Sequence, residues 1–131
     1  MGFFITMSEH DLQSSCVKWF RLKYPKYRLL LFAVPHGAML HGNRLQRVKQ
    51  WNYLKSEGAV KGVSDLILLV AKGEFNGLCI EMKTNKKSSK QSKEQKDFET
   101  AVINQGYAYV VPRTFEEFVS VVTQYLSNGN F

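Results

Sequence analysis

Two carboxylates and a lysine lie at matching ends of two short apolar segments, 62–70 and 77–83. Asp65 opens the apolar part of the first segment, and Glu81 and Lys83 close the second. The connecting residues 71–77 include Gly and Asn, which favour a hairpin, so we expect antiparallel pairing that brings the three side chains to one end of a sheet. Glu81 and Lys83 are two residues apart and would share one face of a strand. Two carboxylates beside an ammonium could hold a divalent cation and hydrolyse a phosphodiester.

The same residues also have a purely structural interpretation. An Asp at the start of a strand is often only a turn residue, and alternating charges in a strand often mark a solvated edge. Fifteen residues, many of them apolar, separate Asp65 from Glu81. This spacing suits a hairpin whose two ends meet, so it favours the metal site.

The elements that must position these residues follow from apolar periodicity and from helix caps. Capping-box starts at Ser8, Ser92 and Thr114 indicate helices. We expect helices over about 8–24, 43–57, 92–105 and 114–126, and strands over 28–34, 62–70, 77–83 and 107–111. The strand at 28–34 is nearly all apolar and is expected to be buried. The order α-β-α-β-β-α-β-α predicts an α/β fold with a single mixed β-sheet flanked by helices.

The length of 131 residues suits one domain with its own core, and an apolar content of 44% indicates a globular chain. We expect a short N-terminal extension over 1–7, one domain over 8–126 and a C-terminal tail over 127–131. No apolar run is long enough to span a bilayer, and residues 1–7 lack the basic start of a signal peptide. The protein is therefore expected to be cytoplasmic. Neither the two cysteines nor the three histidines have the spacing of zinc ligands.

Lysine and arginine outnumber acidic residues by 18 to 11, and the net charge of +7 favours a polyanionic partner such as nucleic acid. A lysine tract follows Lys83, and the helix at 43–57 combines basic and aromatic residues, some of which we expect to be buried. A run of lysines is usually a solvated face, but this one leaves the candidate site directly. The candidate DNA-binding residues are His36, Arg44, Arg47, Lys86, Lys87 and Lys90.

The order of elements and several short motifs resemble the VRR-NUC family of the PD-(D/E)xK nuclease superfamily, in its small stand-alone form from phages and bacteria. The resemblance extends from Ser8 to about Leu126. In one respect the chain departs from the superfamily: Ser64 stands where a proline usually precedes the catalytic Asp. The motifs that carry the resemblance are Ser8-Glu9, Val34-Pro-His-Gly37, Lys61-Gly-Val-Ser-Asp65, Ile80-Glu-Met-Lys83, Ser92-x-x-Gln95 and Val111-Pro-Arg113.

The resemblance implies a restriction-endonuclease-like core and assigns roles to individual residues. Asp65, Glu81 and the backbone carbonyl of Met82 would bind Mg²⁺ or Mn²⁺, and Lys83 would be the catalytic lysine. Glu9 would reach the metal from the first helix, although a Glu in a first turn often only favours the helix dipole. Gln95 would support the site, although its place in a capping box alone would also explain it.

The function that the resemblance implies is a metal-dependent DNA endonuclease. Stand-alone relatives in this family are dimers that act on four-way junctions, and the chain carries no appended domain, so we expect a homodimer that cuts branched DNA, in the host cytoplasm if phage-encoded. Candidates for the dimer interface are Phe3, Phe4, Trp51 and Phe131. Two alternatives remain open: a non-catalytic nucleic-acid-binding module, and a restriction-type nuclease that selects a short sequence.

Overall fold

The computed structural model describes residues 7–34, 40–85 and 90–129, and in them four strands form one mixed sheet. The sheet order is β1-β2-β3-β4; β2 pairs antiparallel with β1 and β3, and β4 pairs parallel with β3. This arrangement confirms the predicted fold class. The elements are α1 (Glu9–Lys23), the 3₁₀ helix η1 (Pro25–Leu30), β1 (Leu31–Ala33), α2 (Arg44–Ser56), β2 (Leu66–Leu68), β3 (Leu78–Ile80), α3 (Lys93–Asn104), β4 (Ala108–Val110) and α4 (Phe115–Asn128).

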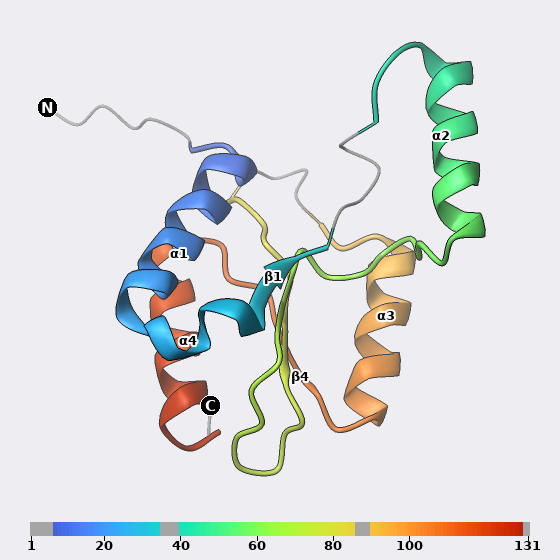
Figure 1. Cartoon of the computed structure of the whole chain (residues 1–131). Coiled ribbons are helices and arrows are strands. Elements are labelled where there is room, and N and C mark those ends of the chain that lie inside the picture. Colours follow the sequence, from blue (N-terminus) through green and yellow to red (C-terminus); the bar gives the residue numbers. More distant parts are fainter. Residues whose placement is uncertain (1–6, 35–39, 86–89, 130–131) are drawn as a thin grey trace, which may run out of the picture.

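Two layers of helix enclose the sheet. Helices α1 and α4 cover one face and α3 lies on the other (Figure 1). The core lies between the sheet and the α1–α4 layer, where Phe20, Phe118 and Val122 are fully buried together with Leu66 of β2. The hydroxyl of Tyr125 donates to the carbonyl of Val70 at 2.6 Å, which ties α4 to the segment after β2. This packing fixes the two central strands.

The predicted helix starts are present. The side chains of Ser8, Ser92 and Thr114 each accept a hydrogen bond from a backbone N–H of the first turn that follows. At Ser92 the capping box is complete, because the backbone N–H of Ser92 also donates to Oε1 of Gln95. Helix α4 continues to Asn128, two residues beyond the expected end of the domain at Leu126.

The prediction of a buried strand over 28–34 is wrong in its first half. Pro25 begins a 3₁₀ helix that runs to Leu30, and the strand itself spans only Leu31–Ala33. Proline fixes the backbone angle φ at a helical value, which suits the first turn of a helix. Since β1 is an edge strand, its outer side is open: Phe32 is 40% exposed, and Leu29 of the preceding 3₁₀ helix is 89% exposed.

The expectation that α2 buries some of its apolar or aromatic residues is also wrong. None of its 13 residues is buried, and Tyr53 is 66% exposed. The helix stands apart from the sheet, beyond α3 (Figure 1). Its N-terminus is held locally by a capping box between Asn43 and Gln46. None of the helices in the described ranges is long and apolar enough to cross a membrane.

Candidate functional site

The pairing of β2 with β3 brings the two predicted carboxylates together. Leu66 lies opposite Ile80 in the antiparallel register, so the next residues outward are Asp65 and Glu81. The ladder itself ends there, and the Asp65 carboxylate accepts the N–H of Met82 through Oδ2 at 2.7 Å. Asp65 is therefore held by the backbone of the strand that carries Glu81.

On the other side of the segment that follows β3, the hydrogen-bond partners come from β4 and the residues after it. The N–H of Glu81 donates to Val110 at 2.9 Å and that of Lys83 to Pro112 at 3.3 Å. These bonds alternate with that of Met82 toward Asp65, which is the pattern of an extended strand between two neighbours. Glu81 and Lys83 therefore sit on a backbone fixed from both sides.

Glu81 is a buried carboxyl that is only partly satisfied by hydrogen bonds. Its side chain is 2% exposed; Oε1 accepts from Nε2 of Gln95 at 3.0 Å, and Oε2 has no hydrogen-bond partner among the described residues. Burial, and then the charge and proximity of Asp65, raise the pKa of Glu81 to about 9, and the nearby ammonium of Lys83 opposes this rise. Asp65 can hydrogen-bond to Glu81 only while one of the two carboxyls holds a proton.

Gln95 links the site to the start of α3. Its Oε1 accepts the N–H of Ser92 at 2.8 Å, and its Nε2 donates to Glu81. Gln95 therefore both caps α3 and contacts the Glu81 carboxyl. The loop before Asp65 touches the same helix end: Gly62 has φ of +93°, and a Cβ there would lie 2.4 Å from the carbonyl carbon of Glu94. Only glycine allows this close approach.

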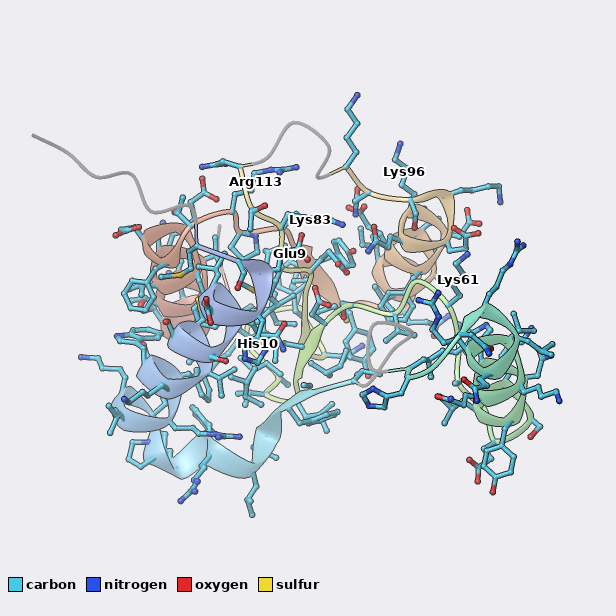
Figure 2. The ribbon with its side chains drawn as sticks, turned by 90° about the horizontal axis from the view of Figure 1, so that it is seen from above. Glu9, His10, Lys61, Lys83, Lys96 and Arg113 are labelled. Carbon is cyan, nitrogen blue, oxygen red and sulfur yellow. The ribbon has the colours of Figure 1, made fainter. Side chains whose placement is uncertain are left out.

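A cavity of about 420 Å³ lies over this end of the sheet. It collects the predicted residues Glu9, Asp65, Glu81, Lys83 and Gln95, together with Leu40, Trp51, Lys61, Gly62, Val63 and Ser92. In Figure 2, which looks down on the molecule from above, Glu9 and Lys83 lie over the region between α1 and α3. The charge of Glu9 also raises the pKa of Glu81, which is consistent with its place at the cavity.

The described basic residues that were predicted to bind DNA do not line this cavity. Arg44 and Arg47 are exposed on α2, and they share a helical face with Trp51, which is half-buried and lines the cavity. Lys90 is exposed just before α3. Several predicted residues lie outside the described residues: His36, Lys86 and Lys87, and the interface candidates Phe3, Phe4 and Phe131.

Sequence reasoning missed Tyr109 and gave Lys61 no role of its own. Burial, and then the charge of Glu81, raise the pKa of Tyr109 well above its usual range, and its hydroxyl accepts from Nε2 of Gln91 at 3.2 Å. Tyr109 lies on β4, in parallel register with Cys79, so pairing of the last strand with the Glu81 strand would have been the signal. Lys61 lines the cavity and forms an exposed salt bridge with Glu94 at 3.7 Å.

The donor set suits a hard divalent cation. In the described ranges, no three His, Cys, Asp or Glu side chains converge on one metal position. Two carboxylates do converge, and the buried Oε2 of Glu81 has no hydrogen-bond partner there. Mg²⁺ is usually held by one or two carboxylates while it keeps several waters, so these oxygen donors fit it.

Comparison with known proteins supports the fold. No protein-family model matches the chain, and no curated protein matches it. A solved structure named "VRR_NUC domain protein" superposes with a TM-score of 0.78 over 98% of this chain and 95% of its own, at 24% sequence identity. The chain shares the fold of this VRR_NUC domain protein. At this identity the match shows the fold and no more.

Proposed function

We propose that the chain is a divalent-metal-dependent DNA endonuclease of the VRR-NUC type, within the PD-(D/E)xK superfamily. The carrying observation is the buried Glu81 carboxyl, which has an unpartnered Oε2 and lies beside Asp65 in the wall of a cavity. Two ionised carboxylates about 4 Å apart repel by roughly 4 kcal/mol at an effective dielectric near 20. A cation bound between them removes this repulsion, which supports a metal site.

The roles of the residues follow from their contacts. Mg²⁺ or Mn²⁺ at Asp65 and Glu81 would polarise a phosphate and lower the pKa of bound water. The N–H and C=O of an extended residue point to the same side, so the carbonyl of Met82 is directed, like its N–H, toward Asp65. Lys83 would orient the attacking water or stabilise charge on the phosphate oxygens. Gln95 holds Glu81 in place through the Nε2 hydrogen bond.

The remaining candidates are proposed as outer contacts. Glu9 lies at the same cavity and would bind the metal through its carboxylate. Arg44 and Arg47 would contact phosphates along the face of α2 that carries Trp51. The lysines at 86, 87 and 90, and His36, are proposed to contact DNA on the strength of the sequence.

Cleavage assays test the catalytic proposal directly. Duplex, flap and four-way-junction DNA are incubated with the protein in Mg²⁺, Mn²⁺ or EDTA, beside the variants Asp65→Ala and Glu81→Ala. Glu74→Ala, which removes an exposed carboxylate far along the hairpin loop, is the matched control. We expect cleavage only with metal, and only by the wild type and the control. DNA binding without cleavage would instead support a non-catalytic module, and cutting at one short sequence would support a restriction-type nuclease.

We further propose that the protein acts as a homodimer on four-way junctions. Helix α2 exposes Leu45 by 63% and Val48 by 47%, and no described element covers them. A twofold dimer through such a surface would present two sites to the two equivalent strands of a junction. Light scattering should give a dimer, which Leu45→Asp with Val48→Asp should dissociate. A monomer at micromolar concentration, with equal rates on duplex and junction, would contradict this proposal.

A further inference from the structure

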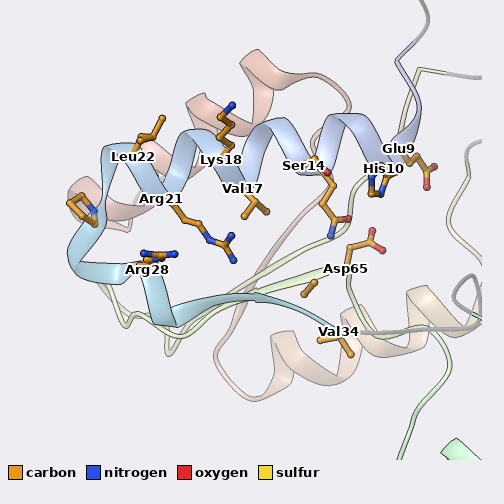
Figure 3. A pocket seen from close by; sticks show the side chains of 13 residues that line it. Glu9, His10, Ser14, Val17, Lys18, Arg21, Leu22, Arg28, Val34 and Asp65 are labelled. Atoms are coloured by element: carbon orange, nitrogen blue, oxygen red, sulfur yellow. The ribbon is translucent and has the colours of Figure 1, made fainter.

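A second and larger groove opens from the candidate site. It has a volume of about 880 Å³ and lies between α1 and the segment formed by η1 and β1. Glu9 and Asp65 line both this groove and the site cavity, so the groove adjoins the candidate site. Figure 3 shows Asp65, Glu9 and His10 at one end of the groove, with α1 running along it.

The far end of the groove is basic. Arg21 of α1 and Arg28 of η1 both line it, and Figure 3 shows them at the end away from Asp65. Neither arginine forms a salt bridge with any described residue, and the acidic residues that line the groove, Glu9 and Asp65, lie at the opposite end. Two guanidinium groups that face one space repel each other unless an anion lies between them, and phosphate is the anion that their planar donors fit best.

The walls between the two ends suit a single nucleic-acid strand. Val17, Ala33 and Val34 supply apolar surface, and Gln13 and Ser14 supply hydrogen-bonding groups. Single strands expose sugars and base faces that a duplex stacks away, so a groove that is partly apolar and partly basic favours the single strand.

The length of the groove sets how far the strand would extend. Arg21 follows His10 by eleven residues on α1, which is about 17 Å along a helix. At the B-form rise per strand, this length corresponds to at most about five nucleotides, because an unstacked strand is more extended.

We infer that this groove holds a single strand of DNA leading away from the scissile phosphate, and that Arg21 and Arg28 together clamp a phosphate no more than about five nucleotides from it. The inference rests on the proposed nuclease function and adds a footprint to it: the substrate would carry an unpaired strand on one side of the cut. Both arginines are binding residues here, because they lie at the other end of the groove from the carboxylates that would hold the metal.

Binding measurements in EDTA test the groove without cleavage. Labelled duplexes carry 5′ or 3′ single-stranded tails of zero, two, five or eight nucleotides, each with and without a terminal phosphate. The wild type is compared with Arg21→Gln/Arg28→Gln and with the matched control Lys23→Gln/Lys26→Gln. The control removes the same charge next to the groove arginines, and neither lysine lines the groove. Thermal melting checks that all three proteins are folded.

For the wild type and the control we expect affinity to rise with tail length up to about five nucleotides and then to level off. The arginine variant should show no such rise. Loss of this single-strand phosphate contact reduces the salt slope by about 0.7, so between 50 and 200 mM salt the wild type should lose roughly threefold more affinity than this variant. A gain confined to phosphorylated tails assigns the clamp to a terminal phosphate, and a gain with both tails assigns it to an internal one.

Equal tail-length dependence in the arginine variant and the lysine control would overturn the proposal that a single strand binds in this groove. The nuclease proposal is judged separately, by metal-dependent cleavage of the same DNA by the wild type. If the wild type cleaves DNA but its affinity does not depend on tail length, the groove proposal is wrong and the nuclease proposal stands. If the wild type shows neither cleavage nor tail-length dependence, both proposals are wrong.

Discussion

Glu81→Gln should make the metal-free protein more stable while abolishing cleavage. Burial and Asp65 raise the pKa of Glu81 from 4.5 to about 9, so the folded protein holds a proton that the unfolded chain releases. The stabilisation from this proton is complete below pH 4.5 and is lost as the pH rises through the folded pKa. Glutamine has the same shape, stays neutral at every pH and can still accept from Gln95.

The magnitude follows from the linkage between proton binding and folding. Each pH unit above the unfolded pKa costs about 1.4 kcal/mol, so by pH 7 the wild type should have lost roughly 3 kcal/mol of stability relative to low pH. For a chain of this size that loss corresponds to about 10 °C in Tm. Glu81→Gln should escape it and melt about 10 °C above the wild type at pH 7 in EDTA.

The assay is a set of melting curves from pH 5 to pH 8.5 in EDTA and again in excess Mg²⁺. Magnesium at about one hundred times its Kd stabilises the wild type by about 2.7 kcal/mol, which should close the gap to the variant at pH 7. Glu74→Gln, at an exposed position, should follow the wild type throughout. Parallel pH profiles for wild type and Glu81→Gln in EDTA would refute the reasoning, because they would mean that Glu81 takes up no proton on folding.

Three further substitutions test the supports of the site. Lys83→Met should keep most metal binding in calorimetry but slow single-turnover cleavage by roughly 10²–10³-fold, because in the proposed mechanism it removes the charge that would face the phosphate. An unchanged rate would exclude a catalytic role. Gln95→Ala should lower the free energy of unfolding by about 2 kcal/mol, because it removes both a helix cap and a hydrogen-bond donor to the buried carboxyl of Glu81. Gln46→Ala removes only the equivalent cap of α2 and should lower it by about 1 kcal/mol or less. Equal losses would show that the contact with Glu81 contributes no stability. Gly62→Ala should lower the free energy of unfolding by roughly 1–3 kcal/mol or more in chemical denaturation, because its Cβ would meet the backbone of α3. The loss should be larger than for Gly58→Ala, since Gly58 also has a positive φ but has open space around it. A larger loss for Gly58→Ala would contradict the close packing at Gly62.

The candidate site was predictable because it depends on a short hairpin. The register of two strands joined by a few residues follows from their apolar pattern and their turn, and this placed Asp65 and Glu81 at one sheet end. The order of helices and strands was predictable for a similar reason, since caps and apolar periodicity are local signals. The contact between Gln95 and Glu81 was harder to predict, because the two residues are fourteen positions apart and the capping motif indicates only the cap.

Other features depend on what surrounds an element, which its own residues do not encode. The run Leu29–Phe32 has the apolar character of a central strand, yet it lies at an open edge and begins with a 3₁₀ turn. Trp51 and Tyr53 have the character of a buried helix face, yet α2 packs against no core. The groove beside α1 joins residues 21 and 28 to residue 65, and only the fold brings them to one space.

Helix α2 separates selection for folding stability from selection for binding to other molecules, which usually act on the same residues. None of its residues is buried, so most substitutions on it should change the folding free energy by no more than about 0.5 kcal/mol. Pressure to keep particular residues there must then come from molecules outside the chain, whether DNA or a second copy. Among relatives, substitution rates along α2 would therefore record changes of substrate or partner, while those of β2, β3 and the adjoining Asp65 and Glu81 would record the maintenance of the fold and its carboxylates.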